Sequence, residues 1–225
     1  IGYSEILIEE TAPDDQQLAD LQAINGAGQS LLRMINELLD LSKLEAGKME
    51  LHLESFALRG FVDQIAREWV KPVADSGNEF RVDCAEDLGE VVGDSAKLSQ
   101  AVGSLLSNAA KYTKGGCVTL SASNEGGWIA VAISDTGPGI GPDQLANLFE
   151  TFGKQDGETS SIYRETAGLG LPLSQRLCRL MAGDLTVDSG LGRGSRFTIR
   201  VPSNLANSNG SPAAESVLSV SSESL

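Results

Sequence analysis

The sequence predicts an α+β protein, in which a helical hairpin precedes a sandwich of one mixed sheet with helices on a single face. Three observations lead to this prediction. Residues 14–46 repeat apolar side chains at alternating steps of three and four, and clusters of strand-like and helix-like patterns follow them. The chain also has 225 residues, of which 41% are hydrophobic and 21% charged, enough to bury a core of ordinary size.

The repeat in residues 14–46 is a coiled-coil seam that widens toward the stripe used in four-helix bundles. Its members are Leu21, Ile24, Gly28, Leu31, Ile35 and Leu38, with Leu32 and Leu39 beside them. Residues 1–10 have the pattern of a preceding helix, so we expect residues 1–47 to form a hairpin. A seam this apolar needs a partner, which is either a second copy of the chain or the chain's own next domain.

A second domain, residues 48–202, is predicted because the periodicity changes after Gly47. Six segments have strand patterns: MELHLESF at 49–56, NEFRVDC at 78–84, CVTLSAS at 117–123, WIAVAISD at 128–135, DLTVDS at 184–189 and SRFTIRV at 195–201. The two strands around NEGG are expected to pair as a hairpin.

Helices are predicted over four stretches of this domain, at about 57–75, 94–112, 142–149 and 169–182. Asp94 is the expected N-cap of the second. A long irregular loop is expected at 153–167. Residues 203–225 are Ser-rich and poor in apolar residues, which is typical of a linker or tail.

Charge and cysteine content exclude several functions. The net charge of −14 argues against nucleic acid or an anionic membrane surface as a partner, because both need clustered Lys and Arg. No apolar run approaches the roughly 20 residues that span a bilayer. The three cysteines, Cys84, Cys117 and Cys178, are far apart, so we expect a reducing, cytoplasmic environment and no structural zinc. The chain begins inside an apparent helix without a cap, which predicts a fragment whose upstream part is missing.

The helix predicted from Asp94 has two faces of different character. One is an apolar stripe for the sheet, made of Leu98, Val102, Leu105 and Ala109. The adjoining face carries Ser104, Asn108, Lys111 and Tyr112. An amide oxygen, a cation and an aromatic ring can meet a metal, a phosphate and a base. The alternative is an ordinary solvated face.

A second polar constellation follows the strand at 128–135, in the segment AISDTGPGI. Asp135 ends the strand, and Gly137 and Gly139 allow a flat ligand to approach the backbone. A carboxylate only accepts hydrogen bonds, so it favours the adenine amino group over the guanine carbonyl. The alternative is a plain Asp-Gly turn.

A third constellation is the pair Gly168 and Gly170 before the last predicted helix, whose free N–H groups suit an anion. Neither a Walker phosphate loop nor GxGxxG occurs. Together the three constellations predict an ATP site of a different kind.

Four motifs and the hairpin carry a resemblance to sensor histidine kinases over nearly all of residues 1–202. They occur in the order of that family: IGYSEIL with LLDLSKLEAGKMEL, LSQAVGSLLSNAAKYTKGG, SDTGPGI, LFETFGKQD, and AGLGLPLSQRLCRLMAGDLTVDSGLGRGSRFTIRVP. The resemblance implies a dimerisation and phosphoacceptor hairpin followed by a Bergerat-type (GHKL) ATP-binding domain. It also implies a homodimer, ATP and Mg²⁺ as cofactors, and a response regulator receiver domain as partner.

The resemblance also assigns roles to residues. Asn108 would bind Mg²⁺, Lys111 would lie near the phosphates and Tyr112 against the adenine. Asp135 would hold the adenine amino group, with Gly137 and Gly139 allowing close approach. Gly168, Leu169, Gly170 and Leu171 would close on the phosphates. Gly192, Gly194 and Ser195 would support the base. Phe149 and Phe152 would belong to a lid, with simple core packing as the alternative.

The chain departs from the family in three places. The phosphoacceptor histidine is absent, because the only histidine, His52, falls in a predicted strand. Ser104 stands where many members have Asn or Glu, and residues 165–167 replace glycines. The leading hypothesis is a histidine kinase. Its rivals are a degenerate pseudokinase acting as a nucleotide-sensing dimeric scaffold and, because of the hairpin the least favoured, a chaperone-type or mismatch-repair-type ATPase.

Overall fold

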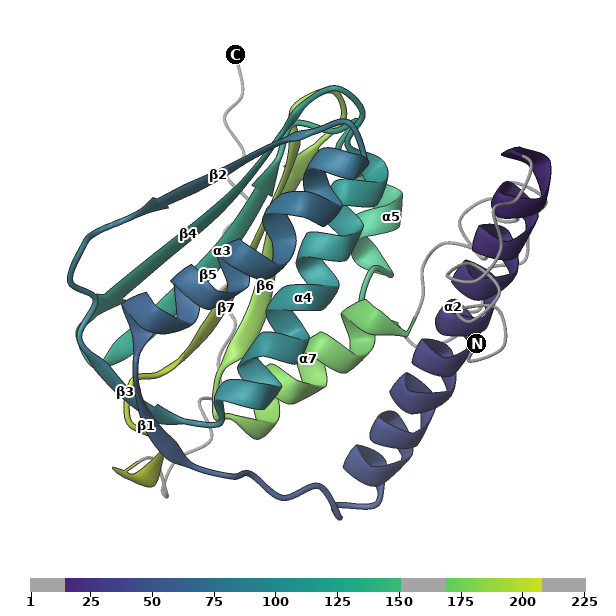
Figure 1. Ribbon diagram of the computed structural model, residues 1–225. Coiled ribbons are helices and arrows are strands. Elements are labelled where there is room, and N and C mark those ends of the chain that lie inside the picture. Colours follow the sequence, from purple (N-terminus) through teal and green to yellow (C-terminus); the bar gives the residue numbers. More distant parts are fainter. Residues whose placement is uncertain (1–14, 151–168, 208–225) are drawn as a thin grey trace.

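A computed structural model describes residues 15–150 and 169–207 of the chain (Figure 1). The helices are α2 (Asp15–Glu45), α3 (Leu58–Asp75), α4 (Ser95–Tyr112), α5 (Pro142–Ala146) and α7 (Gly170–Leu180), with a short 3-10 turn at Leu205–Asn207. The strands are β1 (Glu54–Ala57), β2 (Glu79–Cys84), β3 (Glu90–Gly93), β4 (Cys117–Glu125), β5 (Trp128–Asp135), β6 (Asp184–Gly190) and β7 (Gly194–Pro202).

Five strands form one mixed sheet in the order β2-β4-β5-β7-β6. β2 runs parallel to β4, and the other neighbours are antiparallel. β1 and β3 pair separately as a small antiparallel sheet. Helices α3, α4 and α7 lie together on one face of the large sheet (Figure 1). The predicted mixed sheet with helices on one face is therefore confirmed.

The core lies between this sheet and the three helices. The predicted apolar stripe of α4 is buried, with Leu98, Val102, Leu105 and Ala109 all at most 5% exposed. Opposite them lie buried side chains from β4, β5 and β7, among them Leu120, Ile133 and Ile199. The N-terminus of α4 is fixed by Asp94, whose carboxylate accepts a hydrogen bond from the Lys97 N–H at 2.9 Å, as a capping residue should.

Helix α2 stands beside this sandwich and contacts it only near its own C-terminal end (Figure 1). There Leu41 is buried, Asp40 accepts a hydrogen bond from Gln100 of α4 at 2.7 Å, and Glu45 pairs with Arg176 of α7 at 2.6 Å. The seam farther along α2 stays open: Ile24, Leu31, Leu32, Ile35, Leu38 and Leu39 are 47–62% exposed. The part of the chain's own domain that the structure describes therefore does not bury these side chains.

The element boundaries correct the sequence predictions in three places. Residues 49–53 alternate like a strand but form none, since β1 begins only at Glu54, where pairing with β3 starts. β3 itself was not predicted, because its four residues are too few to show a period. The helix expected at 142–149 ends at Ala146.

Packing continues beyond residue 202, where the sequence predicts a tail. The carbonyl oxygen of Ser203 accepts a hydrogen bond from the Val92 N–H at 2.9 Å, and Leu205 is buried in the core. Among the described residues, 15–150 and 169–207, no helix is both long enough and apolar enough to cross a membrane.

Candidate functional site

The last turns of α4 present the side chains predicted to meet metal, phosphate and base. Asn108 and Tyr112 are half-buried, and Lys111 is exposed. The ammonium nitrogen of Lys111 lies 5.4 Å from the centre of the Tyr112 ring, within the range of a cation–π contact. Within residues 15–150 and 169–207, the Asn108 amide makes no hydrogen bond to another side chain, so its oxygen is available as a hard ligand.

A residue that the sequence did not reveal fixes this end of α4. Asn78 is buried, and its amide nitrogen donates to the carbonyl oxygens of Ala110 at 3.1 Å and Thr113 at 3.0 Å. Its amide oxygen accepts from the N–H of Gly116 at 3.1 Å. The last carbonyls of a helix have no partner within it, so Asn78 satisfies them and holds Asn108 and its neighbours in place.

The carboxylate of Asp135 lies at the end of β5, beside this part of α4. It accepts a hydrogen bond from the Gly137 N–H at 2.8 Å and another from the N–H of Ser195, its cross-strand partner on β7. A Cβ at Gly137 would stand 3.3 Å from the Tyr112 carbonyl oxygen, so this loop passes directly against the end of α4. The Asp-Gly turn and the end of α4 thus share one site.

Burial raises the pKa of Asp135 above its usual value, because a carboxylate loses hydration there. The two backbone N–H bonds, from Gly137 and Ser195, act in the opposite direction. Among the residues that the structure describes, this carboxylate is partly desolvated and forms no ion pair, so it is prepared to accept a hydrogen bond from a ligand.

The loop after Asp135 fits closely against the turn between β6 and β7. Gly139 has a φ of +72°, and a Cβ there would lie 2.0 Å from the carbonyl oxygen of Gly190, so only glycine can occupy the position. The Gly192 N–H donates to the Pro138 carbonyl at 2.7 Å. Ser195 is buried beside Asp135, at the start of β7.

The N-terminus of α7 approaches α4 at Ser104. A Cβ on Gly170 would lie 2.5 Å from the Ser104 hydroxyl oxygen, so a small residue at each position lets the helices meet. Leu169 caps α7 without a side-chain bond, and the Leu171 side chain belongs to the core. Only the backbone of Leu171 can therefore face a ligand. Gly168, residues 165–167 and Phe152 lie outside the described residues.

The three predicted constellations thus converge on the C-terminal half of α4, from β5, β7 and α7. Asp135 and Ser195 pair at one side, and Gly170 rests on Ser104 at the other. Phe149 packs against the core, which is the arrangement expected from the sequence as the alternative to a place in a lid. Such a site, with oxygen ligands, a cation, an aromatic face and free helix N–H groups, can hold a purine nucleotide with its phosphates.

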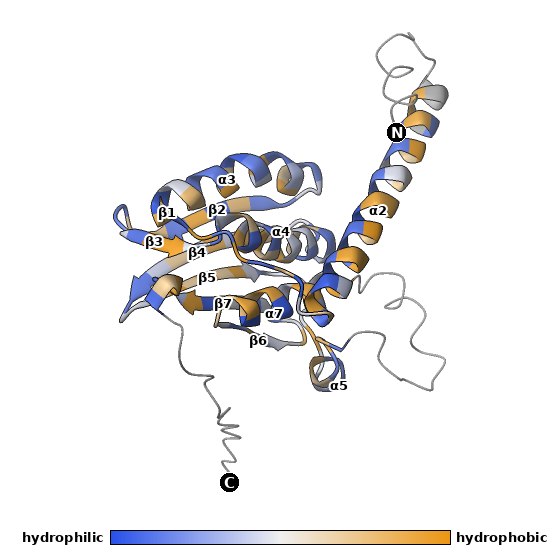
Figure 2. Cartoon of the chain, turned by 90° about the horizontal axis from the view of Figure 1, so that it is seen from below, coloured by the Kyte–Doolittle hydropathy of each residue, from blue (hydrophilic) through white to orange (hydrophobic). Residues whose placement is uncertain are grey.

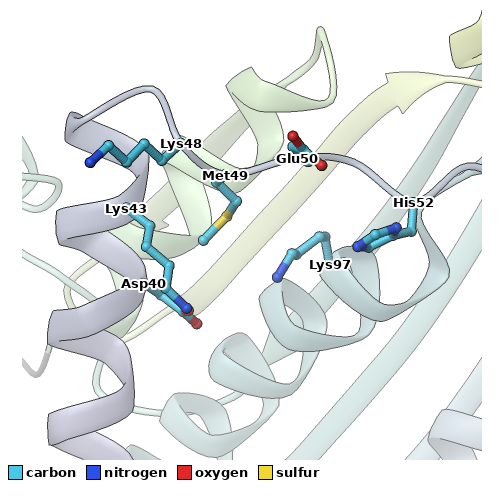
Figure 3. A pocket seen from close by; sticks show the side chains of 7 residues that line it. All are labelled: Asp40, Lys43, Lys48, Met49, Glu50, His52 and Lys97. Atoms are coloured by element: carbon cyan, nitrogen blue, oxygen red, sulfur yellow. The ribbon is translucent and has the colours of Figure 1, made fainter.

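A separate cleft of about 280 Å³ lies at the other end of α4 (Figure 3). It is lined from α2, the segment after α2 and the first turn of α4, by Asp40, Lys43, Lys48, Met49, Glu50, His52 and Lys97. None of the predicted nucleotide residues lines it. His52 is exposed there, outside any strand, and its backbone N–H donates to Asp94 at 2.9 Å.

The fold and site define an ATPase-type sandwich attached to a bundle-forming helix. The family described as "Histidine kinase-, DNA gyrase B-, and HSP90-like ATPase" matches residues 93–205, and "His Kinase A (phospho-acceptor) domain" matches residues 1–47. The chain therefore belongs to the first of these families, and the two matches in this order make it a member of the sensor histidine kinases.

Known relatives agree with this assignment. "Hybrid signal transduction histidine kinase B" of Dictyostelium discoideum is 33% identical over 89% of the chain, and "Sensor histidine kinase RcsC" of Escherichia coli is 32% identical over 80%. The chain spans only 10% and 19% of their lengths. The crystal structure of full-length ShkA in complex with AMPPNP superposes with a TM-score of 0.70, at 32% identity, over 87% of this chain and 41% of that one.

Proposed function

We propose that the chain is the ATP-binding and partial dimerisation region of a histidine kinase, which transfers the γ-phosphoryl group of ATP to a histidine. Residues 48–202 would bind and orient the nucleotide, and residues 1–47 would form part of a dimeric four-helix bundle. One observation carries the proposal: Asp135, positioned by the N–H groups of Gly137 and Ser195, adjoins the end of α4 that carries Asn108.

Each site residue has a role in this proposal. Asp135 accepts a hydrogen bond from the adenine amino group, and Tyr112 packs against the base. Lys111 brings positive charge to the phosphates. The backbone from Gly168 to Leu171 approaches the phosphates at the start of α7, where free N–H groups favour an anion.

Asn108 offers an amide oxygen, a ligand type that Mg²⁺ accepts together with water and phosphate oxygens, so the residues present fit this metal. Bound Mg²⁺ would neutralise charge on the phosphates during transfer. The protein's own contribution is to position the nucleotide and to keep its base end fixed.

The acceptor histidine cannot be in residues 1–47, which contain none. In the proposed reaction, a ring nitrogen of a histidine preceding the chain forms a bond to the γ-phosphorus while the bond from phosphorus to the bridging oxygen of ADP breaks. The phosphoryl group would then pass to an aspartate of a response regulator receiver domain. The open seam of α2 supports the homodimer, because two copies can bury it in each other.

Titration of the chain with a non-hydrolysable ATP analogue and Mg²⁺ tests the nucleotide site. We expect binding on the order of 1–100 μM, within the range of KM values usual for enzymes. Asn108→Asp should weaken this binding at least about tenfold, because the neutral amide becomes a carboxylate whose negative charge repels the phosphates. Asn36→Asp, on the exposed surface of α2, is the matched control and should leave it unchanged.

Labelling tests the transfer. The protein carrying its upstream histidine should gain an acid-labile phosphate from labelled ATP, and the Asn108→Asp variant should not. Binding without any labelling would contradict the kinase and favour a nucleotide-sensing scaffold. Steady ATP hydrolysis without a phosphoprotein would instead favour an ATPase of another class.

A further inference from the structure

The hydroxyl of Ser189, near the end of β6, contacts three groups that surround the proposed base site. It accepts a hydrogen bond from the Ile140 N–H at 2.9 Å, in the loop that follows Asp135. It donates to the carbonyl oxygen of Gly194 at 2.9 Å. It also lies 2.9 Å from the hydroxyl oxygen of Ser195. One side chain thus joins the Asp135 loop to both residues that begin β7.

Hydrogen counting fixes the direction of the bond between the two serines. A hydroxyl has one hydrogen to donate and two lone pairs to accept with. The Gly194 carbonyl can only accept, so the Ser189 hydrogen goes there. The single assignment that satisfies all three contacts makes the Ser195 hydroxyl donate to Ser189. The lone pairs of Ser195 then remain as acceptors.

Ser195 and Asp135 are neighbours in the same assembly. They are directly opposed residues of the β5–β7 pair, so their side chains project from the same face of the sheet. The Ser195 N–H also donates to the Asp135 carboxylate. Both side chains therefore present hydrogen-bond acceptors on one face, Asp135 through its carboxylate oxygens and Ser195 because its hydrogen is committed to Ser189.

We propose that Ser189 is a positioning residue that sets nucleotide specificity: it holds the Asp135 loop against β7 and keeps the Ser195 hydroxyl hydrogen away from the base. This inference rests on the proposed function. A pair of acceptors matches the amino group at position 6 of adenine, which donates. It opposes the oxygen at the same position of guanine, which only accepts.

Removing the Ser189 hydroxyl should release both restraints. In Ser189→Ala the Ile140 N–H and the Gly194 carbonyl lose a partner, so the loop is held less firmly. The Ser195 hydrogen becomes free to turn toward the base, where it can donate to the guanine oxygen. We therefore expect weaker ATP binding and a smaller preference for ATP over GTP.

Thr186 provides a matched control on the same strand. Its hydroxyl also donates to a carbonyl of β7, that of Thr198 at 3.5 Å, but the residue is exposed and lies away from the Asp135 loop. Thr186→Ala therefore removes a hydroxyl from β6 without touching the base site. Ser189→Thr is the conservative variant, because it keeps a hydroxyl at the same position and suits a strand.

Calorimetric titration of the 225-residue chain with non-hydrolysable ATP and GTP analogues tests the proposal. For Ser189→Ala we expect the Kd of the ATP analogue to rise about tenfold, the effect of one hydrogen bond lost in a partly buried site. The ratio of the Kd of the GTP analogue to the Kd of the ATP analogue should fall. Ser189→Thr should restore both values, and Thr186→Ala should change neither.

Unchanged constants for Ser189→Ala, or equal weakening of both analogues, would overturn the proposal, since a purely structural role affects both nucleotides alike. If Ser189→Ala does not fold, the Ser195→Ala variant tests the proposal instead. If that variant keeps the full wild-type preference for ATP over GTP, the proposal is overturned. Failure of the wild-type chain to bind either analogue would instead refute the proposed function itself.

Discussion

Helix α2 and the sandwich differ in how far they bury their apolar side chains. In the sandwich, large side chains such as Leu105, Ile133 and Ile199 are less than 2% exposed. In α2, side chains of the same kind, Leu31 and Leu38 among them, are more than half exposed. Figure 2 shows hydrophobic residues recurring along the length of α2. The sandwich therefore completes its core within one chain, whereas the described residues leave an apolar surface of α2 exposed, as expected of a helix that packs against a partner.

The difference separates two sources of stability. Burial of a large apolar side chain is worth about 1.5–3 kcal/mol, and the sandwich gains this on folding alone. In the proposed dimer, the same gain in α2 would depend on protein concentration, because it would come from association. Substitutions that are chemically identical should therefore have different effects in the two regions.

The largest expected contrast is between Leu105→Ala and Leu38→Ala. Leu105→Ala should lower the free energy of unfolding of the sandwich by about 3 kcal/mol, since it leaves a cavity in a packed core. Leu38→Ala should change it by less than about 0.5 kcal/mol. Urea denaturation followed by tryptophan fluorescence measures this selectively, because both tryptophans, Trp69 and Trp128, lie in the sandwich.

Sedimentation or size-exclusion chromatography over a range of concentrations completes the comparison. Leu38→Ala should shift the dimer toward monomers, and Leu105→Ala should not do so while it stays folded. Equal effects of the two substitutions on both measurements would show that the seam is not an association surface.

A smaller loss of stability is expected from Asn78→Ala, which removes polar contacts inside the sandwich. It removes three hydrogen bonds and leaves the Ala110 and Thr113 carbonyls without their partner, so we expect a loss of about 2 kcal/mol. Asn124→Ala is the control, because Asn124 donates one bond, to the Leu88 carbonyl at 2.8 Å, and should cost about 1 kcal/mol. A smaller loss for Asn78 than for Asn124 would contradict this role.

The sequence predicted the elements whose signals are local. The period of α4 and its Asp94 cap were sufficient to separate its core face from the face of Asn108. The turn NEGG fixed the pairing of β4 with β5. Long strands and helices repeat their pattern often enough to be recognised, whereas residues 49–53 show that alternation without a pairing partner does not make a strand.

The supporting residues of the site could not be predicted in this way. Asn78 reaches Ala110 over 32 positions and Ser189 reaches Ile140 over 49, so nothing near either residue in the chain shows its partner. Ser189 also looks like any polar residue near the end of a strand. Residues that face a ligand belong to motifs, but residues that hold those motifs in place appear only when the chain is folded.

At Asp135, folding stability and nucleotide binding make opposite demands on the carboxyl group. Burial raises its pKa in the folded protein above the unfolded value of 3.8, so the folded state holds its proton more strongly. The carboxyl therefore contributes most stability below pH 3.8, and this contribution is lost as the pH rises through the folded pKa. Asp135→Asn, which cannot ionise, should avoid that loss.

Denaturation curves at several pH values measure the effect. The free energies of unfolding of Asp135→Asn and of the wild type should be closest in acid. As the pH increases, the variant should become more stable relative to the wild type. The same variant should bind the ATP analogue at least about tenfold more weakly, because its amide can turn a donor toward the adenine amino group. A constant difference at all pH values would contradict the raised pKa.

The smallest effect is expected where the two regions meet, at the ion pair between Glu45 of α2 and Arg176 of α7. The Glu45 side chain is 60% exposed, so water and salt screen the pair, and Glu45→Gln should weaken the contact by about 0.5 kcal/mol or less. Hydrogen exchange of the last turn of α2 measures this as roughly a twofold faster opening. The difference should disappear in about 1 M salt, where the Debye length is about 3 Å.

Lys43→Gln, on the same turn but in none of the ion pairs of the described residues, should have no effect on this exchange rate. A loss of protection many times larger for Glu45→Gln would mean that this pair, and not the buried Leu41, holds α2 to the sandwich.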